Sequence, residues 1–213
     1  MIRKVGILGG TFDPVHNGHL ALAKAAGEIC NLDEIVLLPA ALPPHKQGVY
    51  ITEFSQRVAM LDIAVKELEQ VTVSTVEQLL PVPSFTIETL HYLKLHSPTS
   101  VQFYFICGAD TFLDILSWKS CEKILEQSDF IVFSRTGMSN KKLKSFIREL
   151  GFLKKSVNSW EHPENLKQIY HANLSPHDVS SSEVRKRLRK GKSVGSLVPK
   201  EVARYIEANS LYT

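Results

Sequence analysis

Short runs of hydrophobic residues recur along the chain, and segments with helical spacing of hydrophobic positions lie between them. Four runs are clear, a shorter strand-like segment lies at 71–73, and a weaker one covers 169–172; the clear runs are 5–8, 34–38, 101–106 and 130–133. Continuous hydrophobic runs are typical of strands buried on both faces, whereas half-exposed strands alternate hydrophobic and polar residues. The pattern therefore predicts an α/β fold, a doubly wound parallel sheet with helices on both faces.

The segments between the strands have helical spacing or loop composition. We expect helices over 18–30, 58–68, 111–127 and 141–150, and two more that begin near residues 181 and 199. Ser84 is expected to cap a further helix, and Pro199 suits a first helical position. The proline-containing stretch 40–54 reads as a long surface loop, and 160–173 has no clear pattern.

Length and composition narrow the class of protein. The 213 residues fit a single domain over 1–213, and 44% hydrophobic with 22% charged residues excludes a disordered chain. A net charge of +3 does not by itself indicate a nucleic-acid or membrane-surface protein. No hydrophobic stretch approaches the roughly 20 residues that span a bilayer, and the chain opens without a signal peptide. Three cysteines without zinc-ligand spacing read as buried, reduced thiols, so we expect a cytoplasmic protein.

A glycine-rich turn with two histidines follows the first predicted strand. It reads GGTFDPVHNGH over residues 9–19. Glycines let the backbone approach an anion, and the N–H groups at the start of the next helix favour a phosphate. His16 and His19 would project to the same side and can donate hydrogen bonds to phosphoryl oxygens. The pattern favours a phosphate site; a zinc site at the two histidines, or a plain turn capped by Asp13, is the alternative.

A second polar turn opens the helix expected near residue 181. It reads VSSSEVRKRLR over residues 179–189. Ser180 and Glu183 fit a capping box. Arg185 and Arg189 share another face, and an arginine one turn into a helix whose start carries hydroxyl and N–H groups forms a phosphate site. A solvated basic helix is the alternative interpretation.

Both turns resemble signatures of the nucleotidylyltransferase superfamily. HNGH at 16–19 is similar to its [T/H]xGH motif, and the second turn resembles its SSxxxR-type element. The GGTFDPVHNGH form and the segment 197–206 resemble bacterial nicotinate-mononucleotide adenylyltransferases. The resemblance implies a Rossmann-like sheet, with His16, His19 and Arg185 catalytic. It also implies that the ATP-binding residues are Gly9, Gly10, Thr11, Phe12, His16, His19, Ser180, Ser181 and Arg185.

The middle of the chain carries the expected contacts to the second substrate. The segments PPHK at 43–46, SFTIETL at 84–90 and GAD at 108–110 match that family's pattern, except that Phe85 replaces the usual tyrosine. The resemblance implies that Trp118 stacks on the pyridine ring, that Thr86 contacts the nicotinate end and that Asp110 holds ribose hydroxyls. The full implied set is Lys46, Thr86, Asp110, Trp118 and Arg135.

The implied reaction joins ATP and nicotinate mononucleotide into nicotinate adenine dinucleotide, with release of pyrophosphate. The phosphate of the mononucleotide is already a nucleophile, so the protein would act by positioning and charge neutralisation. Mg²⁺ would be held mainly by the ATP phosphates and water. The expected partners are these two nucleotides, with no nucleic acid and no membrane, and a homo-oligomer is compatible with the sequence.

The sequence leaves several alternatives open. An adenylyltransferase for nicotinamide mononucleotide or for phosphopantetheine belongs to the same enzyme class, although the first loop of the latter usually has Pro-Gly-Thr-Phe. The basic run 185–192 would suit a nucleic-acid-binding module, but no aromatic residues are interleaved with it. A nucleotide sensor without catalysis is the third alternative, and ATP-dependent release of pyrophosphate would separate it from an enzyme.

Overall fold

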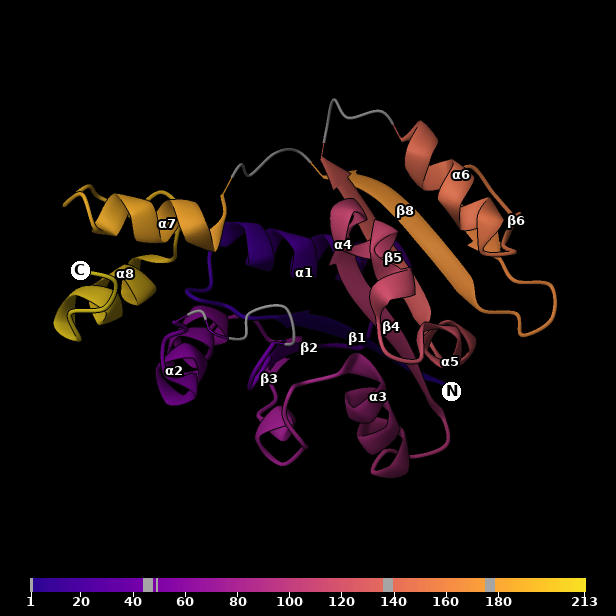
Figure 1. Cartoon of the computed structure of the whole chain (residues 1–213), viewed down its shortest axis with the longest axis horizontal. Helices are drawn as coiled ribbons and strands as arrows, with labels where there is room; N and C mark the ends of the chain where they lie inside the picture. Colours follow the sequence, from indigo (N-terminus) through magenta and orange to yellow (C-terminus); the bar gives the residue numbers. More distant parts are fainter. Residues whose placement is uncertain (1, 44–47, 49, 136–139, 175–178) are drawn as a thin grey trace.

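A single sheet organises the computed structural model, which describes residues 2–43, 48, 50–135, 140–174 and 179–213. Among these residues the strands lie in the order β3-β2-β1-β4-β5-β8-β7-β6 (Figure 1). The strands are β1 (Arg3–Gly10), β2 (Glu34–Pro39), β3 (Val71–Val73), β4 (Val101–Gly108), β5 (Asp129–Arg135), β6 (Leu153–Lys154), β7 (Ser159–Glu161) and β8 (Gln168–Leu174).

Strands β3 to β8 in this order are parallel, which confirms the predicted parallel sheet and the weak strand at 169–172. From β1 the chain builds outward through β2 and β3, and then returns to place β4 on the other side of β1. The order therefore reverses between β1 and β4. In sheets of this kind, ligands bind outside the carboxyl ends of the strands at such a reversal.

The helices cover both faces of the sheet (Figure 1). They are α1 (Asn17–Cys30), α2 (Phe54–Val65), α3 (Thr86–Leu95), α4 (Ala109–Leu113), α5 (Cys121–Gln127), α6 (Lys141–Glu149), α7 (Ser181–Leu188) and α8 (Lys200–Ala208), with 3-10 turns η2 (Val76–Gln78) and η3 (Ile115–Ser117). α1, α2, α7 and α8 pack on one face, and α3 to α6 pack on the other.

The two faces carry separate hydrophobic cores because neighbouring strand residues point in opposite directions. In β1, Leu8 packs with the α1 side, whereas Val5 and Ile7 pack with the α3 side. In β5, Ile131 and Val132 divide in the same way. Burial on both faces explains why the sequence shows continuous hydrophobic runs.

Three local predictions differ from the structure. The helix expected over 111–127 is broken into α4, η3 and α5, and Ser120 adopts a left-handed conformation with φ 54° at the break. Ser84 does not cap α3, because Phe85 is the N-cap; the Ser84 hydroxyl instead accepts hydrogen bonds from the backbone N–H groups of Ala41 and Leu42. Pro199 is the N-cap of α8, one residue before its predicted place.

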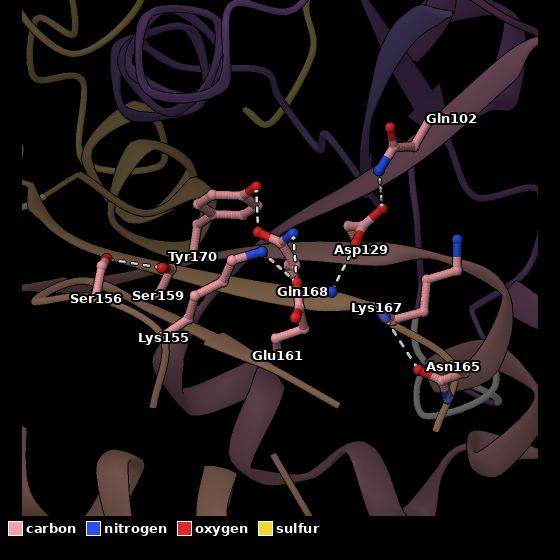
Figure 2. Close-up of polar contacts among 10 residues, drawn as sticks. All are labelled: Gln102, Asp129, Lys155, Ser156, Ser159, Glu161, Asn165, Lys167, Gln168 and Tyr170. Atoms are coloured by element: carbon pink, nitrogen blue, oxygen red, sulfur yellow. Dashed lines mark hydrogen bonds and ion pairs between the residues drawn. The ribbon is translucent and has the colours of Figure 1, made fainter. Parts of the chain in front are cut away.

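An antiparallel hairpin extends the sheet, and it occupies the stretch that had no clear pattern. β7 pairs antiparallel with β8 and with β6. Figure 2 shows the polar contacts that accompany it: the Tyr170 hydroxyl donates to Gln168 (2.7 Å), and the Gln168 amide donates to Glu161 (2.9 Å), which also pairs with Lys155. At the start of β5, the Asp129 carboxylate accepts from the Gln168 backbone N–H at 2.6 Å. These contacts fix an edge of short, polar strands, which the prediction of a wholly parallel sheet did not include.

Two further observations concern the chemistry of the chain as a whole. Cys30 is buried as expected, whereas Cys107 and Cys121 are half-buried, and all three are free thiols. Across the described ranges, no helix is both long and hydrophobic enough to cross a lipid bilayer.

Candidate active site

The loop after β1 is shaped by a buried phenylalanine. Phe12 adopts φ 50° and is 1% exposed, so its ring lies in the core beneath the turn. A Cβ atom at Gly10 would lie 3.1 Å from that ring, which is tighter than ordinary contact. Gly10 therefore lets Phe12 fold back under the loop, and the backbone of Gly9 to Thr11 stays at the surface of a cavity.

His16 and His19 lie together at the start of α1, as predicted. Their rings stack with centroids 3.6 Å apart. The centroids of the His19 and Phe12 rings lie 4.8 Å apart in an edge-to-face arrangement. His16 is the N-cap residue, and its backbone N–H donates to Nδ1 of His19 at 3.2 Å. A Cβ atom at Gly18 would lie 3.0 Å from Nδ1 of His16, so a side chain at this position would press on the His16 ring.

Burial controls the protonation of both rings. It lowers the pKa of His16 to about 4, because the charged form loses hydration. Burial also lowers the pKa of His19 well below its usual range, and the neighbouring His16 adds to the effect. Both imidazoles are therefore neutral at pH 7. Nδ1 of His16 is buried without a hydrogen-bond partner in the described part of the chain.

α7 closes against the first loop, although the two segments are far apart in the sequence. Figure 1 shows α7 beside the start of α1. The Ser181 hydroxyl donates to the carbonyl of Pro14 (2.9 Å), and Nη1 of Arg185 donates to the carbonyl of Asp13 (2.6 Å). Ser180 caps α7 by accepting from the Glu183 backbone N–H at 3.1 Å. The Glu183 side chain pairs with Arg187, so only half of the expected capping box forms.

A cavity of about 740 Å³ lies beside this loop, at the carboxyl ends of β1, β2 and β4. Its volume is in the range of small-molecule sites. Five of the predicted residues line it, namely Gly9, Gly10, Thr11, Thr86 and Trp118. A larger open groove of about 1650 Å³ runs along α1, α2 and α8, with lysines and glutamates mixed along its walls. None of the predicted site residues is among the described residues that line it, although Asn17 of the first motif is.

The end of the cavity away from the first loop is formed by α3 and the broken helix. Trp118 is half-buried at the break before Ser120, so the interruption turns its ring toward the cavity. Phe85 also lines this end, and Nζ of Lys119 lies 4.8 Å from the centre of its ring. The buried carboxylate of Glu77 accepts from the Thr89 hydroxyl at 3.0 Å and braces the same wall.

Of the other predicted residues, none is among the described residues that line the cavity. Six of them form the junction of the first loop with α7, namely Phe12, His16, His19, Ser180, Ser181 and Arg185. The other three are Asp110, Arg135 and Lys46. Asp110 is exposed in the first turn of α4, and it is not among the described residues that line the cavity. Arg135 is the last residue of β5, so its backbone is at the carboxyl edge of the sheet. Lys46 falls outside the described residues. Within the described ranges no three metal-ligating side chains gather, so the zinc alternative gains no third ligand.

Sequence reasoning missed a buried arginine. Arg57 of α2 is 1% exposed, and its guanidinium donates to the carbonyls of Thr11 (2.8 Å), Ala40 (2.9 Å) and Thr52 (2.9 Å). It therefore ties the loops after β1 and β2 to the start of α2. Its position inside the hydrophobic stripe of α2 was the available signal.

It also missed the surroundings of Asp13. The Asp13 carboxylate is buried, accepts a hydrogen bond from the Tyr212 hydroxyl at 2.7 Å and lies 3.9 Å from Arg185. No local pattern in the sequence links these residues, because the contacts span almost the whole chain.

Comparisons with known proteins identify the family of the chain. The profile of the cytidylyltransferase-like family matches residues 7–187. A protein of Desulfotalea psychrophila named "Probable nicotinate-nucleotide adenylyltransferase" is 40% identical over 99% of this chain and 100% of its own length. A protein of Carboxydothermus hydrogenoformans with the same name is 37% identical and covers 98% of each chain.

Solved structures show the same fold at lower identity. Nicotinic acid mononucleotide adenylyltransferase of Plasmodium falciparum, complexed with NaAD, superposes with a TM-score of 0.74 at 23% identity, covering 99% of this chain and 97% of its own. From its profile match and its full-length relatives, the chain belongs to the nicotinate-nucleotide adenylyltransferases of the cytidylyltransferase-like family.

Proposed function

We propose that this chain transfers the adenylyl group of ATP to nicotinate mononucleotide, in the synthesis of NAD. The observation that carries the proposal is the union of the first loop with α7. It joins two neutral imidazoles and Arg185 to the loop whose residues Gly9, Gly10 and Thr11 line a cavity at the strand-order reversal. The names of the full-length relatives support the choice of substrates.

The reaction needs no nucleophile from the protein. A phosphate oxygen of the mononucleotide forms a bond to the α-phosphorus of ATP, and the bond from that phosphorus to the bridging oxygen of the β-phosphate breaks. Pyrophosphate leaves with the electron pair. The protein lowers the barrier by holding the two phosphates in line and by offsetting their repulsion with donors and positive charge.

The two histidines supply donors whose orientation is fixed. Nδ1 of His19 accepts from the backbone N–H of His16, so the neutral His19 ring carries its proton on Nε2. That N–H is the group we assign to the ATP phosphates. The His16 ring stacks on His19 and keeps it in this orientation, while its own Nδ1 is buried in the loop. Arg185 supplies the positive charge, and the phosphates can come close to the backbone of Gly9, Gly10 and Thr11.

We assign the cavity wall near α3 to the mononucleotide. Trp118 offers an aromatic face for the pyridine ring, and stacking adds about 0.5–1.5 kcal/mol beyond the buried area. Thr86 begins α3, where free backbone N–H groups suit the ring carboxylate. Asp110, Lys46 and Arg135 remain predicted contacts to this substrate.

We assign Mg²⁺ to the ATP that enters the site. The carboxylate nearest the phosphate loop, Asp13, is already engaged by Tyr212 and faces Arg185, so the donor set here suits an ion carried by phosphate oxygens and water. The ion supplies charge neutralisation on the departing pyrophosphate. The phosphate contacts themselves are left to His16, His19, Arg185, Ser180 and Ser181, although the Ser181 hydroxyl donates its proton to Pro14 in this structure.

We further propose that the partners are nucleotides in the cytoplasm rather than nucleic acid. The three free cysteines suit a reducing compartment. Part of the basic run on α7 is neutralised locally, since Arg187 pairs with Glu183 at 3.1 Å.

A direct comparison of substrates tests the proposal. Purified protein is supplied with ATP and either nicotinate or nicotinamide mononucleotide, and pyrophosphate release gives kcat/KM for each. We expect the acid to be the better substrate. Preference for the amide would overturn the substrate assignment, and the absence of pyrophosphate release with both would overturn the enzymatic one.

Trp118→Ala tests the placement of the pyridine ring. We expect KM for the mononucleotide to rise about tenfold, because stacking and burial are lost, while KM for ATP stays within about twofold. Leu116→Ala is the matched control, because Leu116 lies in the same turn and is 61% exposed. Equal losses for both substrates would place the ring elsewhere.

A further inference from the structure

The C-terminal segment reaches into the first loop. After α8, the chain turns back on itself: the Leu211 backbone N–H donates to the carbonyl of Ile206, and Tyr212 adopts φ 66°. Leu211 and Tyr212 pack against the core between α1, α2, α7 and α8. The turn thereby aims the Tyr212 hydroxyl at Asp13, 199 positions earlier in the sequence.

Asp13 connects this tyrosine to Arg185. Oδ1 of Asp13 accepts the Tyr212 hydroxyl at 2.7 Å, while Oδ2 lies 3.9 Å from Nη1 of Arg185. The same Nη1 donates to the backbone carbonyl of Asp13 at 2.6 Å. Arg185 is thus held by the backbone of the loop, and it has only a long contact with the carboxylate.

We propose that Tyr212 is a positioning residue for adenylyl transfer: its hydroxyl holds the Asp13 carboxylate away from Arg185, so that the guanidinium stays available to the ATP phosphates. The inference rests on the proposed role of Arg185. Asp13 itself is 4% exposed, so its carboxylate has little water to turn to. Two guanidinium groups interact with this carboxylate, but that of Arg57 already donates to backbone carbonyls. Without the tyrosine hydroxyl, Arg185 is therefore the guanidinium that would satisfy Oδ1.

The phenol is suited to this task at any physiological pH. Burial is the main cause that raises the pKa of Tyr212 above its ordinary value, and its hydrogen bond to Asp13 adds to the rise. The hydroxyl therefore keeps its proton and remains a donor. If Asp13 paired closely with Arg185, it would compete with ATP for the guanidinium. The affinity for ATP would then fall.

Tyr212→Phe removes only the hydroxyl. We expect KM for ATP to rise about five- to tenfold, with KM for nicotinate mononucleotide within about twofold, because the cost falls on one substrate. Tyr205→Phe is the matched control. Tyr205 also donates its hydroxyl to a side chain, Gln56 at 2.6 Å, but it does so away from the loop. Tyr205→Phe loses the hydrogen bond to Gln56, whereas Tyr212→Phe loses those with Asp13 and Thr52. Only Tyr212→Phe should change ATP affinity, measured by kinetics and by calorimetric titration with MgATP.

A double-variant cycle separates positioning from simple loss of stability. A lysine at position 185 has no planar guanidinium to pair with the Asp13 carboxylate. In Arg185→Lys protein, adding Tyr212→Phe should therefore change KM for ATP by less than about twofold. Equal effects of Tyr212→Phe in both backgrounds, or unchanged ATP affinity in folded Tyr212→Phe protein, would overturn the inference alone. An Arg185→Lys protein with unaltered ATP kinetics would instead overturn the role of Arg185, and the inference with it.

Discussion

The two stacked imidazoles of the first loop could not both carry charge in their present positions. Their centroids are 3.6 Å apart, and burial lowers the pKa of each ring. Like charges at that distance would repel strongly in a buried setting. In the mechanism we propose, the pair therefore acts through oriented N–H groups, and the fixed positive charge comes from Arg185.

His19→Ala should lower kcat far more than it raises KM for ATP. An oriented donor that tightens on the transition state is worth about 10²–10³-fold in kcat, whereas ground-state binding has other contacts. Initial rates of pyrophosphate release over a range of ATP concentrations measure both. The control is His96→Ala, which removes an exposed ring at the C-cap of α3. Turnover near that of the unaltered protein would contradict the role of His19.

The pKa of His16 predicts how stability depends on pH. The unfolded ring binds a proton below about pH 6.5, but the folded ring does so only near pH 4. Between these values the unfolded state holds more protons, so the free energy of unfolding falls as pH falls, by at most about 1.4 kcal/mol per pH unit from this residue. Urea unfolding from pH 7 to 4 gives the free energy of unfolding at each pH. In His16→Gln protein this free energy should fall less steeply with falling pH than in the unaltered protein.

His19 and His171, whose pKa values are also lowered by burial, are present in both proteins. The difference therefore reports on His16 together with its effect on the pKa of His19. Parallel curves for the two proteins would show that the His16 ring is not shielded from water.

At the scale of elements, the loops of the site are held by a helix that lies behind them. Arg57 projects from α2 and donates to carbonyls in the loops after β1 and β2. The guanidinium carbon of Arg57 also lies 5.2 Å from the centre of the Phe54 ring, which covers the guanidinium. The first loop is therefore fixed by a buried cation, Arg57, which is not among the described residues that line the cavity.

Arg57→Leu should destabilise the fold by about 3–5 kcal/mol, because it leaves several buried carbonyl groups without donors. Urea unfolding monitored by circular dichroism gives the value. Arg204→Leu on α8 is the matched control, since Arg204 is exposed and pairs only with Glu201 among the contacts described here, and it should change stability by less than about 0.5 kcal/mol. Similar small losses for both would mean that water replaces the buried guanidinium.

Element patterns in the sequence were informative where packing imposes a period, and uninformative elsewhere. The buried strands of β1, β4 and β5 were found because both of their faces are covered. The break at Trp118 was missed, because Ser120 adopts its left-handed conformation for tertiary reasons that propensity does not encode. β6 and β7 have two and three residues, too few to show any period.

At the scale of the molecule, the joining of the two distant turns could be predicted, and the contacts of Ser181 with Pro14 and of Arg185 with Asp13 confirm it. Each turn carries its own local signal for a phosphate, so a shared ligand connects them. The enclosure of Asp13 could not be predicted. Its partner Tyr212 has no phosphate signal, and a lone tyrosine in a terminal turn reads as an ordinary packing residue.

A ligand that both turns hold should stabilise the whole chain. MgATP at about 100 times its Kd should add about 2.7 kcal/mol to the free energy of unfolding, which appears as a raised Tm. At the same nucleotide concentration Arg185→Ala should gain much less, whereas Arg189→Ala, one turn further along and exposed, should gain as much as the unaltered protein. An equal gain in all three would mean that ATP binds without α7.

The contact between Asp13 and Arg185 can form only after both residues have been synthesised. The two residues are 172 positions apart. At elongation rates of about 5–20 residues per second, roughly 10–35 s pass between the synthesis of the first and that of the second. During translation the nascent β1–α1 unit therefore emerges before its contacts on α7 exist. If both turns bind ATP as we propose, activity is acquired only after α7 has left the exit tunnel.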